Sequence, residues 1–264
     1  MPVCKPLFLG PETAYSWGVA RKAKSSGKSP KRGTWAERAL APYRWLRKWL
    51  VRLVLVAAIV VLGGVAWYSV MNPGQTPYMR FEARRLGGTV DHSWVPLSAV
   101  APVMARSVVA AEDANFCLHW GFDMEAIRAA LEEGSGRGAS TLSQQVVKNV
   151  YLWQGRNWTR KALEAVITPV VEAMWSKRRI IEVYLNVAEF DEGVFGVDAA
   201  AQHYFGVAPG NMSPVQAARL AAVLPSPKTR SAAQPSQRLA RRAAAIQDGA
   251  ETIRRDGRAS CFED

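Results

Sequence analysis

One stretch of the sequence, LVLVAAIVVLGGVAWYSV at residues 53–70, constrains the fold more than any other. Its 18 residues carry no charge, and as a helix they span about 27 Å, close to the thickness of a bilayer's hydrocarbon core. Trp67 and Tyr68 suit one membrane interface, and Trp45 and Trp49 suit the other. The stretch therefore predicts a single transmembrane helix.

Two other interpretations of this stretch are weaker. A cleaved signal peptide would begin nearer the N-terminus, would have a shorter apolar core and would end in a small-x-small cleavage site, which is missing here. A buried core helix would not follow directly on so basic a segment. We therefore expect a permanent anchor.

The charge of the chain is concentrated before the anchor. Residues 1–52 carry 12 Lys and Arg residues against two acidic ones, whereas residues 53–264 carry 22 against 20. Because basic segments stay on the cytoplasmic side of a membrane, we expect residues 1–52 to form a cytoplasmic arm. Such an arm (RKAKSSGKSPKR) also suits nucleic-acid binding. Beside a membrane span, however, the predicted partners include membrane lipids and exclude nucleic acid.

The region after the anchor divides into a linker and a helical domain. Residues 71–96 contain the turn-forming segment NPGQTP and the polar segment RFEARRLGG, which indicate a juxtamembrane linker. From residue 97 to 264 the apolar periodicity is helical and strand signals are sparse. The sequence thus predicts a mostly α chain, with one domain at 97–264 behind a single transmembrane helix at 53–70.

Local signals predict where several helices begin. Ser98 and Asp123 are each placed to cap a helix, and Thr141 with Gln144 has the spacing of a capping box. The segment 213–216 (SPVQ) combines a capping Ser, a Pro at the first helical position and a Gln at the third. We expect a helix after each of these signals.

Other signals predict where helices end. GSGRG should break the chain at 134–138. Pro169 should kink or split the helical stretch at 159–187, because proline cannot donate its backbone hydrogen bond. Of the three cysteines, Cys117 and Cys261 lie after the anchor, and the sequence leaves open whether they pair.

The segment AAEDANFCLHWGFD, residues 110–123, places adjacent carboxylates at the end of an apolar run. A carboxylate there is partly desolvated, and a like-charged neighbour raises its pKa further, which makes an effective general base near neutral pH. Glu112 is the candidate base and Asp113 its tuning or orienting neighbour; a helix end with solvated acids is the alternative. The residues expected to shape the adjoining loop are Phe116, His119 and Gly121.

The segments STLSQQVVKN and GRNWTRKALE, residues 140–149 and 155–164, gather polar and basic side chains. As a helix, the first has an apolar half and a half with amides and one ammonium but no carboxylate, which suits an anion such as phosphate. The second adds cations whose repulsion a bound anion would offset. A solvated face, or a basic surface near lipid headgroups, is the alternative to a diphosphate cradle. The candidate cradle residues are Gln144, Gln145, Lys148, Asn149, Arg156, Arg160 and Lys161.

These segments resemble the conserved blocks of one enzyme family, the peptidoglycan glycosyltransferases of glycosyltransferase family 51. EDANFCLHWGFD resembles the first signature, E-D-x-x-F-x-x-H-x-G-x-D, and GASTLSQQVVKN the second, G-x-S-T-x-x-Q-Q-x-x-K-N. RKALE and SKRRIIEVYLN are similar to the third and fourth, and GVFGVDAAAQHYFG and SPVQAARLAAVLPSPK to the remaining blocks. Because no transpeptidase pattern follows, the chain is similar to the monofunctional, single-span members of Gram-negative bacteria.

The resemblance implies a lysozyme-like helical fold and the polymerisation of lipid II into β-1,4 glycan strands with release of undecaprenyl diphosphate. It implies that Glu112 is the base that deprotonates the acceptor sugar's 4-hydroxyl and that Glu164 is a second important glutamate on the donor side. By the same resemblance, Lys148, Arg156 and Arg160 lie near the diphosphate. The residues that match signature positions shaping that pocket are Ser140, Thr141, Gln144, Gln145 and Asn149.

The expected reaction fixes the expected partners and location. An α-linked donor and a β-linked product require one displacement with inversion, and hence a base on the acceptor side and positive charge at the leaving group. We expect the partners to be lipid II, the growing lipid-linked glycan and membrane lipids; cell-wall synthesis or division proteins could join them. The expected location is the bacterial inner membrane, with the N-terminus cytoplasmic and the domain periplasmic.

No cofactor is expected to be required, although a divalent cation, Mg²⁺ or Mn²⁺, could assist departure of the diphosphate. His119 and His203 do not have metal-ligand spacing, and we interpret both as structural. Two positions depart from the family pattern. Asp191 stands where glycine is usual, with Gly193 able to take over the turn, and Pro169 interrupts a helix.

Two rival functions remain at this point. A lysozyme-like lytic enzyme would also place a glutamate after an apolar helix, but it has little use for cations at a sugar leaving group. An inactive membrane scaffold of the cell-wall machinery would not need the intact EDANF and STLSQQVVKN segments. The sequence therefore favours a glycosyltransferase.

Overall fold

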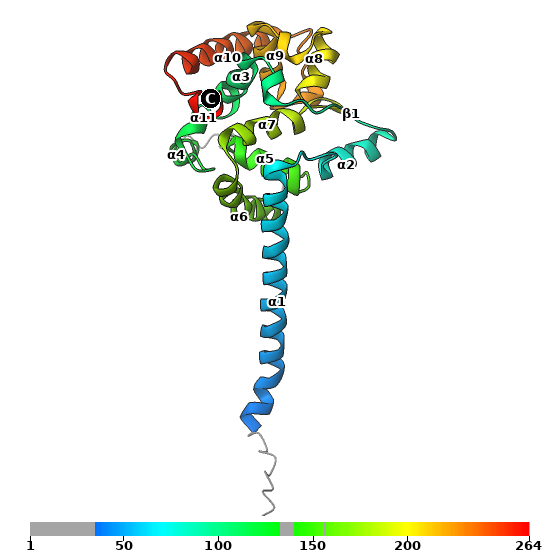
Figure 1. Cartoon of the computed structure of the whole chain (residues 1–264), viewed down its shortest axis with the longest axis vertical. Helices are drawn as coiled ribbons and strands as arrows, with labels where there is room; N and C mark the ends of the chain where they lie inside the picture. Colours follow the sequence, from blue (N-terminus) through cyan, green and yellow to red (C-terminus); the bar gives the residue numbers. More distant parts are fainter. Residues whose placement is uncertain (1–34, 133–139, 156, 264) are drawn as a thin grey trace, which may run out of the picture. The chain divides into compact units, whose positions relative to one another are not determined.

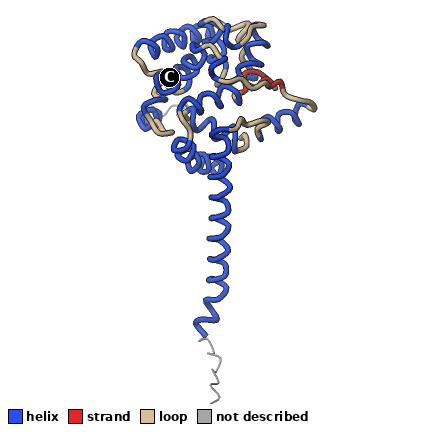
Figure 2. Tube along the Cα trace, viewed as in Figure 1, coloured by secondary structure: helices blue, strands red, loops and turns tan. Residues whose placement is uncertain are grey.

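The computed structural model of the chain describes residues 35–132, 140–155 and 157–263. These residues are mostly helical, as predicted, with a few short strands (Figure 1 and Figure 2). In chain order the elements are α1 (Trp35–Val70), α2 (Pro77–Leu86), β1 (Asp91–His92), η1 (Leu97–Ala99), α3 (Pro102–Glu112), η2 (Phe116–Leu118), α4 (Met124–Glu132), α5 (Leu142–Tyr151), α6 (Trp158–Met174), α7 (Lys177–Val187), β2 (Glu189–Asp191), β3 (Val194–Phe195), α8 (Val197–Phe205), η3 (Pro209–Asn211), α9 (Pro214–Val223), η4 (Pro227–Thr229), α10 (Gln237–Arg255) and α11 (Ser260–Glu263).

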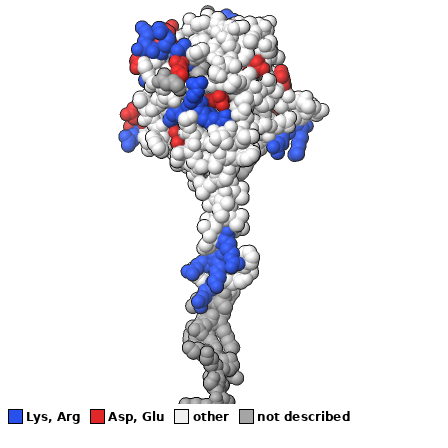
Figure 3. Space-filling model, viewed as in Figure 1, with Lys and Arg blue, Asp and Glu red and all other residues white. Residues whose placement is uncertain are grey.

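Within the described residues, α1 contains one segment long and apolar enough to cross a membrane, Pro42–Val70. This agrees with the predicted single anchor at 53–70. The observed segment begins earlier than predicted, and it ends at the same residue, Val70. The chain divides into two units, residues 1–52 and 53–264. The second unit therefore holds the uncharged part of α1 together with the helical domain. The surface of that uncharged part is free of Lys, Arg, Asp and Glu in Figure 3.

The segment 71–96, predicted as a linker, contains regular structure. Thr76 caps α2, accepting a 3.2 Å hydrogen bond on Oγ1 from the Met79 amide, and Pro77 occupies the first helical position. The turn-forming composition of NPGQTP thus concealed a helix start. After α2, β1 joins a small sheet of order β1-β3-β2, in which Asp91 pairs with Val194 in a parallel register.

The predicted helix starts are confirmed with one exception. Asp123 accepts a 2.9 Å hydrogen bond from the Ala126 amide, and the capping boxes at 141–144 and 213–216 are both present. Ser98, however, lies inside the short turn η1, and α3 begins only at Pro102. The serine was a plausible cap by local sequence, but proline at the first position decides where the helix begins. The predicted break at 134–138 lies outside the described residues.

Of the two effects predicted for Pro169, a kink or a split of the helical stretch, the split is wrong. α6 continues through Pro169 to Met174, and the division falls at Trp175 and Ser176. Ser176 Oγ accepts a 3.1 Å hydrogen bond from the Arg179 amide and so caps α7. One missing backbone donor costs a helix about 3 kcal/mol, and packing of the buried face of α6 offsets that cost.

The core of the second unit positions the functional segments. α10 packs on α3 and α9, and α5 packs on α6 and α7 (Figure 1). The C-terminal end of α3 meets α5, because Glu112 and Asp113 accept hydrogen bonds from Gln145 and Leu142. Two of the segments singled out in the sequence thus come together, although 29 residues lie between Glu112 and Leu142 at the start of α5, with part of that intervening chain outside the described residues.

Candidate active site

Glu112 is the last residue of α3, and its side chain is largely buried, with 14% exposed. Its Oε2 accepts a 2.9 Å hydrogen bond from Gln145 Nε2, and its Oε1 lies 3.9 Å from Arg242 Nη2. Burial raises the pKa of Glu112, against the opposing effects of Gln145, Arg242 and Lys148. The carboxylate thus has the raised pKa that a general base requires.

Asp113 raises the pKa of Glu112, in the direction predicted for a tuning neighbour, although burial is the largest cause of that shift. Its two oxygens also make structural contacts. Its Oδ1 lies 2.8 Å from His119 Nε2, and its Oδ2 accepts a 2.9 Å hydrogen bond from the Leu142 amide. Asp113 therefore ties the loop after α3 to the first turn of α5, because both carboxylate oxygens are engaged there.

The loop after α3 is held by the residues expected to shape it. His119 Nδ1 accepts a 3.2 Å hydrogen bond from the Gly121 amide, so the neutral ring carries its proton on Nε2 and donates it to Asp113. Phe116 is fully buried. Gly121 has φ +85°, and a Cβ there would come within 2.6 Å of Thr168 Cγ2. Glycine is required at this position on both grounds.

The N-terminus of α5 uses three of the predicted pocket residues as structural supports. Gln144 Oε1 accepts a 3.1 Å hydrogen bond from the Thr141 amide, and Thr141 Oγ1 donates a 2.7 Å bond to the Gly121 carbonyl. Ser140 Oγ lies 3.0 Å from Lys161 Nζ. Gln144 is buried and lines neither cavity described below, so its amide serves the capping box.

Two of the predicted cradle cations converge on Glu164. Arg160 Nη1 lies 2.5 Å from Glu164 Oε2, and Lys161 Nζ lies 3.4 Å from Oε1. The repulsion expected between neighbouring cations is therefore offset by this buried carboxylate. Glu164, the second glutamate implied by the resemblance, thus lies in contact with the basic cluster. Arg156 lies outside the described residues.

Lys148 differs from Arg160 and Lys161 in its contacts. It makes no salt bridge within the described part of the chain, and it lines a cavity of about 410 Å³. Burial lowers its pKa, while the nearby carboxylates of Glu164 and Glu112 act in the opposite direction. A desolvated ammonium at a cavity wall is a strong site for an anion.

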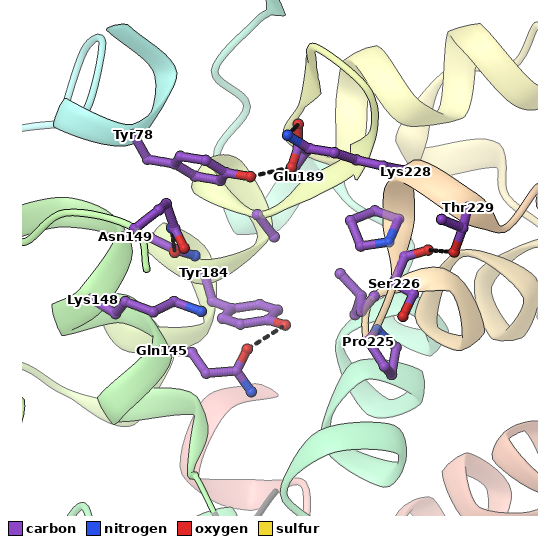
Figure 4. Close-up of a pocket in the computed structure, with 14 residues that line it drawn as sticks. Tyr78, Gln145, Lys148, Asn149, Tyr184, Glu189, Pro225, Ser226, Lys228 and Thr229 are labelled. Atoms are coloured by element: carbon purple, nitrogen blue, oxygen red, sulfur yellow. Dashed lines mark hydrogen bonds and ion pairs between the residues drawn. The ribbon is translucent and has the colours of Figure 1, made fainter. Parts of the chain in front are cut away.

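The cavity at Lys148 is formed by α2, α5, α7, β2 and η4 (Figure 4). Figure 4 shows Gln145 and Lys148 extending from α5 towards Tyr184, whose hydroxyl donates a 3.4 Å hydrogen bond to Gln145 Oε1. Asn149 also lines it, and accepts a 3.2 Å bond from Gln154. Polar side chains of α5 thus line one wall of the cavity.

A second cavity, of about 470 Å³, lies at the C-terminal end of α3. Glu112, Asp113, Ser140 and Thr141 line it. Gln145, which lines the first cavity, bonds directly to Glu112. The hydrogen bond between Gln145 and Glu112 thus links a residue that lines the Lys148 cavity to a residue that lines the second cavity. Basic and acidic side chains gather together on the face of the domain shown in Figure 3.

Several residues of this site carry no clear signal in the sequence. Tyr78 of the supposed linker bonds to Glu189, and Lys228 lies 2.8 Å from Glu82 Oε1 and 3.6 Å from Glu189 Oε1. Tyr184 and Lys228 could have been found, since they belong to the blocks SKRRIIEVYLN and SPVQAARLAAVLPSPK. Tyr78 and Glu82 reach the site only through the long-range packing of α2, which local sequence does not specify.

Cys117 and Cys261 form a disulfide, which settles a pairing that the sequence left open. It joins the loop beside Glu112 to α11. Asp191, the departure from the family pattern, accepts hydrogen bonds on Oδ2 from Tyr204 at 2.9 Å and from His203 at 3.1 Å. Gly193 has φ +75° and makes the turn, as expected.

An apolar anchor, a helical domain and a buried carboxylate beside cations are the features of a membrane-anchored glycosyltransferase with a lysozyme-like domain. Comparison with known proteins gives the same class. The profile of the family described as transglycosylase matches residues 81–251. The chain belongs to this family, and it is a peptidoglycan glycosyltransferase.

Similar proteins cover nearly the whole chain. A biosynthetic peptidoglycan transglycosylase of Jannaschia sp. (strain CCS1) is 53% identical over 244 residues, which are 92% of this chain and 99% of the relative. One from Caulobacter vibrioides is 42% identical over 83% of this chain and 98% of the relative. One from Salmonella typhi is 46% identical over 76% of this chain and 88% of the relative.

Proposed function

We propose that this chain polymerises lipid II into β-1,4 glycan strands and releases undecaprenyl diphosphate. In each step the acceptor's 4-hydroxyl oxygen attacks the donor's anomeric carbon as the bond from that carbon to the diphosphate breaks. The hydroxyl proton passes to Glu112, and the bond electrons leave with the diphosphate. The α-linked donor becomes a β-linked product by one inversion.

The position of Glu112 carries this proposal. Its carboxylate is largely buried, its pKa is raised by that burial, and it lines one cavity while it is hydrogen-bonded to Gln145, which lines the other. Gln145 holds one carboxylate oxygen by a 2.9 Å hydrogen bond, and the other oxygen is left to accept a proton. A carboxylate oriented in this way suits a general base.

The leaving diphosphate is assigned to the cavity lined by Lys148. Its ammonium, which makes no salt bridge among the residues that the structure describes, supplies positive charge where negative charge develops on the leaving group. Arg160 and Lys161 stand behind it, held by Glu164. We assign Glu164 the role of positioning these cations on the donor side. The acceptor sugar then enters from the second cavity, which Glu112 lines.

The contacts of the anchor support activity at a membrane surface. Trp175 Nε1 donates a 2.8 Å hydrogen bond to the Val65 carbonyl, and Arg179 donates bonds of 3.1 Å and 2.6 Å to the carbonyls of Tyr68 and Met71. The domain is thus fixed to the last turns of α1. Since both substrates are lipids, we assign the chain to the inner membrane, with its N-terminus cytoplasmic and its domain periplasmic.

The described residues do not offer a protein site for a divalent cation. No group of three or more His, Cys, Asp and Glu comes together there with the geometry to hold one. We therefore derive no step through a metal. Assays with Mg²⁺, with Mn²⁺ and with a chelator test whether a cation carried by the diphosphate itself assists its departure.

A lipid II polymerisation assay with purified protein in detergent tests the proposal. Glu112→Gln should abolish glycan synthesis, whereas Glu251→Gln, an exposed control on α10, should retain it. A Glu112→Gln variant with normal synthesis would refute the general-base role. Incubation with finished sacculi tests the rival, since loss of polymer without synthesis would show a lytic enzyme.

A further inference from the structure

α10 brings an arginine to the candidate base that the sequence did not single out. α10 packs along α3 (Figure 1), and Arg242 reaches the end of that helix. Its Nη2 lies 3.9 Å from Glu112 Oε1 and 3.5 Å from the Ala111 carbonyl. The side chain is 40% exposed, so part of the guanidinium remains open to a ligand.

The distance between Arg242 and Glu112 is longer than that of a closed ion pair. Charge-assisted hydrogen bonds measure about 2.7–2.9 Å, and in this molecule Arg160 and Glu164 approach to 2.5 Å. Arg242 and Glu112 stop 3.9 Å apart. An oxygen placed about 2.8 Å from each of their facing atoms would fit this gap.

The Arg242 side chain is also incompletely hydrogen-bonded. Its Nε is buried and has no hydrogen-bond partner in the described structure. A buried donor without a partner is unfavourable, and such groups in native structures call for an explanation such as a role in catalysis. The guanidinium thus occupies an unfavourable position beside a carboxylate that it does not fully bind.

We propose that Arg242 is a further catalytic residue, which donates a hydrogen bond to the acceptor's hydroxyl oxygen while Glu112 Oε1 accepts the proton of that hydroxyl. This rests on the proposed function of Glu112. One lone pair of the hydroxyl oxygen accepts the bond from Arg242 and the other attacks the anomeric carbon. Arg242 keeps its own protons throughout, and the leaving diphosphate takes the electron pair of the broken bond.

A purely electrostatic role for Arg242 gives a different expectation. The charged or titratable groups facing Glu112 are Lys148 on α5, Arg242 on α10, Asp113 beside it and the Tyr184 phenol on α7. If Arg242 acted only through this field, its removal would raise the pKa of Glu112 further. The pH–rate curve would then move to higher pH and reach the wild-type plateau.

The pH–rate profile of lipid II polymerisation separates the two roles. We expect Arg242→Gln to lower the plateau rate about tenfold to a hundredfold, with no recovery at high pH. Arg242→Lys keeps the charge but loses the planar fork, and it should also fall short of the plateau. Arg241→Gln, an exposed neighbour on the same helix, should match wild type.

The results for the Arg242 variants and for Glu112→Gln test two different proposals, the role of Arg242 and the role of Glu112. A wild-type plateau in Arg242→Gln, reached at higher pH, would overturn the contact with the hydroxyl. Should Arg242→Gln fail to fold by circular dichroism, Arg242→Lys carries the test, and its wild-type plateau would overturn the contact equally. An active Glu112→Gln variant refutes the base itself, whereas an inactive one combined with normal Arg242 variants refutes only the role of Arg242.

Discussion

Gln145 Nε2 donates a 2.9 Å hydrogen bond to Glu112 Oε2, and this bond joins two segments that are 33 residues apart in the chain. Tyr184 bonds to the oxygen of the same amide, so the orientation of Gln145 is set from its other side. The amide thus fixes one oxygen of the carboxylate, while the other lies 3.9 Å from Arg242 Nη2. For the proposed general base, this arrangement makes Oε1 the oxygen that accepts the proton.

Replacement of Gln145 by leucine should slow lipid II polymerisation about tenfold to a hundredfold. The variant loses the bond that orients Glu112 and lowers its pKa, so the acidic limb of the pH–rate profile should also move to higher pH. Gln202→Leu, at an exposed position on α8, is the matched control. An unchanged profile in Gln145→Leu would show that the amide does not orient the base.

Glu112→Gln should raise the stability of the protein near neutral pH while abolishing activity. The folded state raises the pKa of Glu112, so ionisation opposes folding once the pH exceeds the unfolded pKa of about 4.3. The amide removes this cost, a gain of about 1 kcal/mol in the free energy of unfolding.

Thermal unfolding at several pH values measures this gain, which should disappear well below the unfolded pKa. Glu251 provides the opposite case, because a hydrogen bond from Arg254 lowers its pKa. Glu251→Gln should therefore not stabilise the protein at neutral pH. If Glu112→Gln has a lower melting temperature than wild type at neutral pH, the carboxylate is not destabilised by burial.

The Cys117–Cys261 disulfide should stabilise the loop beside the active site. It closes a segment of 144 residues, and removal of such a bond typically costs about 2–4 kcal/mol. Cys117→Ser with Cys261→Ser should lower the midpoint of chemical unfolding. A reductant should lower the wild-type midpoint in the same way and leave the double variant unchanged. Equal midpoints for all four samples would mean that the bond contributes nothing.

Much of the local structure could be predicted because its causes lie close together in the chain. The boxes at 141–144 and 213–216 need only residues three apart. Glu112 was identifiable as a carboxylate that ends an apolar run. Arg242 was not, because an arginine in the basic segment LARRAAAIQ looks like any solvated side chain. Only the packing of α10 on α3 brings it to the carboxylate.

The errors of prediction have the same origin. Ser98 has the chemistry of a cap, but the proline that starts α3 lies four residues later. Asp113 raises the pKa of Glu112 as a tuning neighbour should, but its oxygens also bond to groups six and 29 residues away. Local sequence did not reveal these two contacts, since side-chain direction is set by tertiary structure.

Lys148 should contribute more to catalysis than Lys161, although both belong to the basic cluster. Lys148 lines the cavity and makes no salt bridge in the described part of the chain, whereas Lys161 contacts Glu164 and Ser140. Lys148→Gln should lower the polymerisation rate about a hundredfold or more, as expected when a transition-state charge loses its partner. Lys161→Gln should have a smaller effect.

The pH dependence gives a sharper test of Lys148. Because burial lowers its pKa, the ammonium loses its proton at lower pH than an exposed lysine does, and the rate should fall as the pH rises through that value. Lys148→Arg keeps the charge at every accessible pH. This variant should therefore move the alkaline limb of the pH–rate profile to higher pH, even if its maximal rate is lower. An alkaline limb that stays in place in Lys148→Arg would assign the titration to another group and remove Lys148 from the leaving-group side.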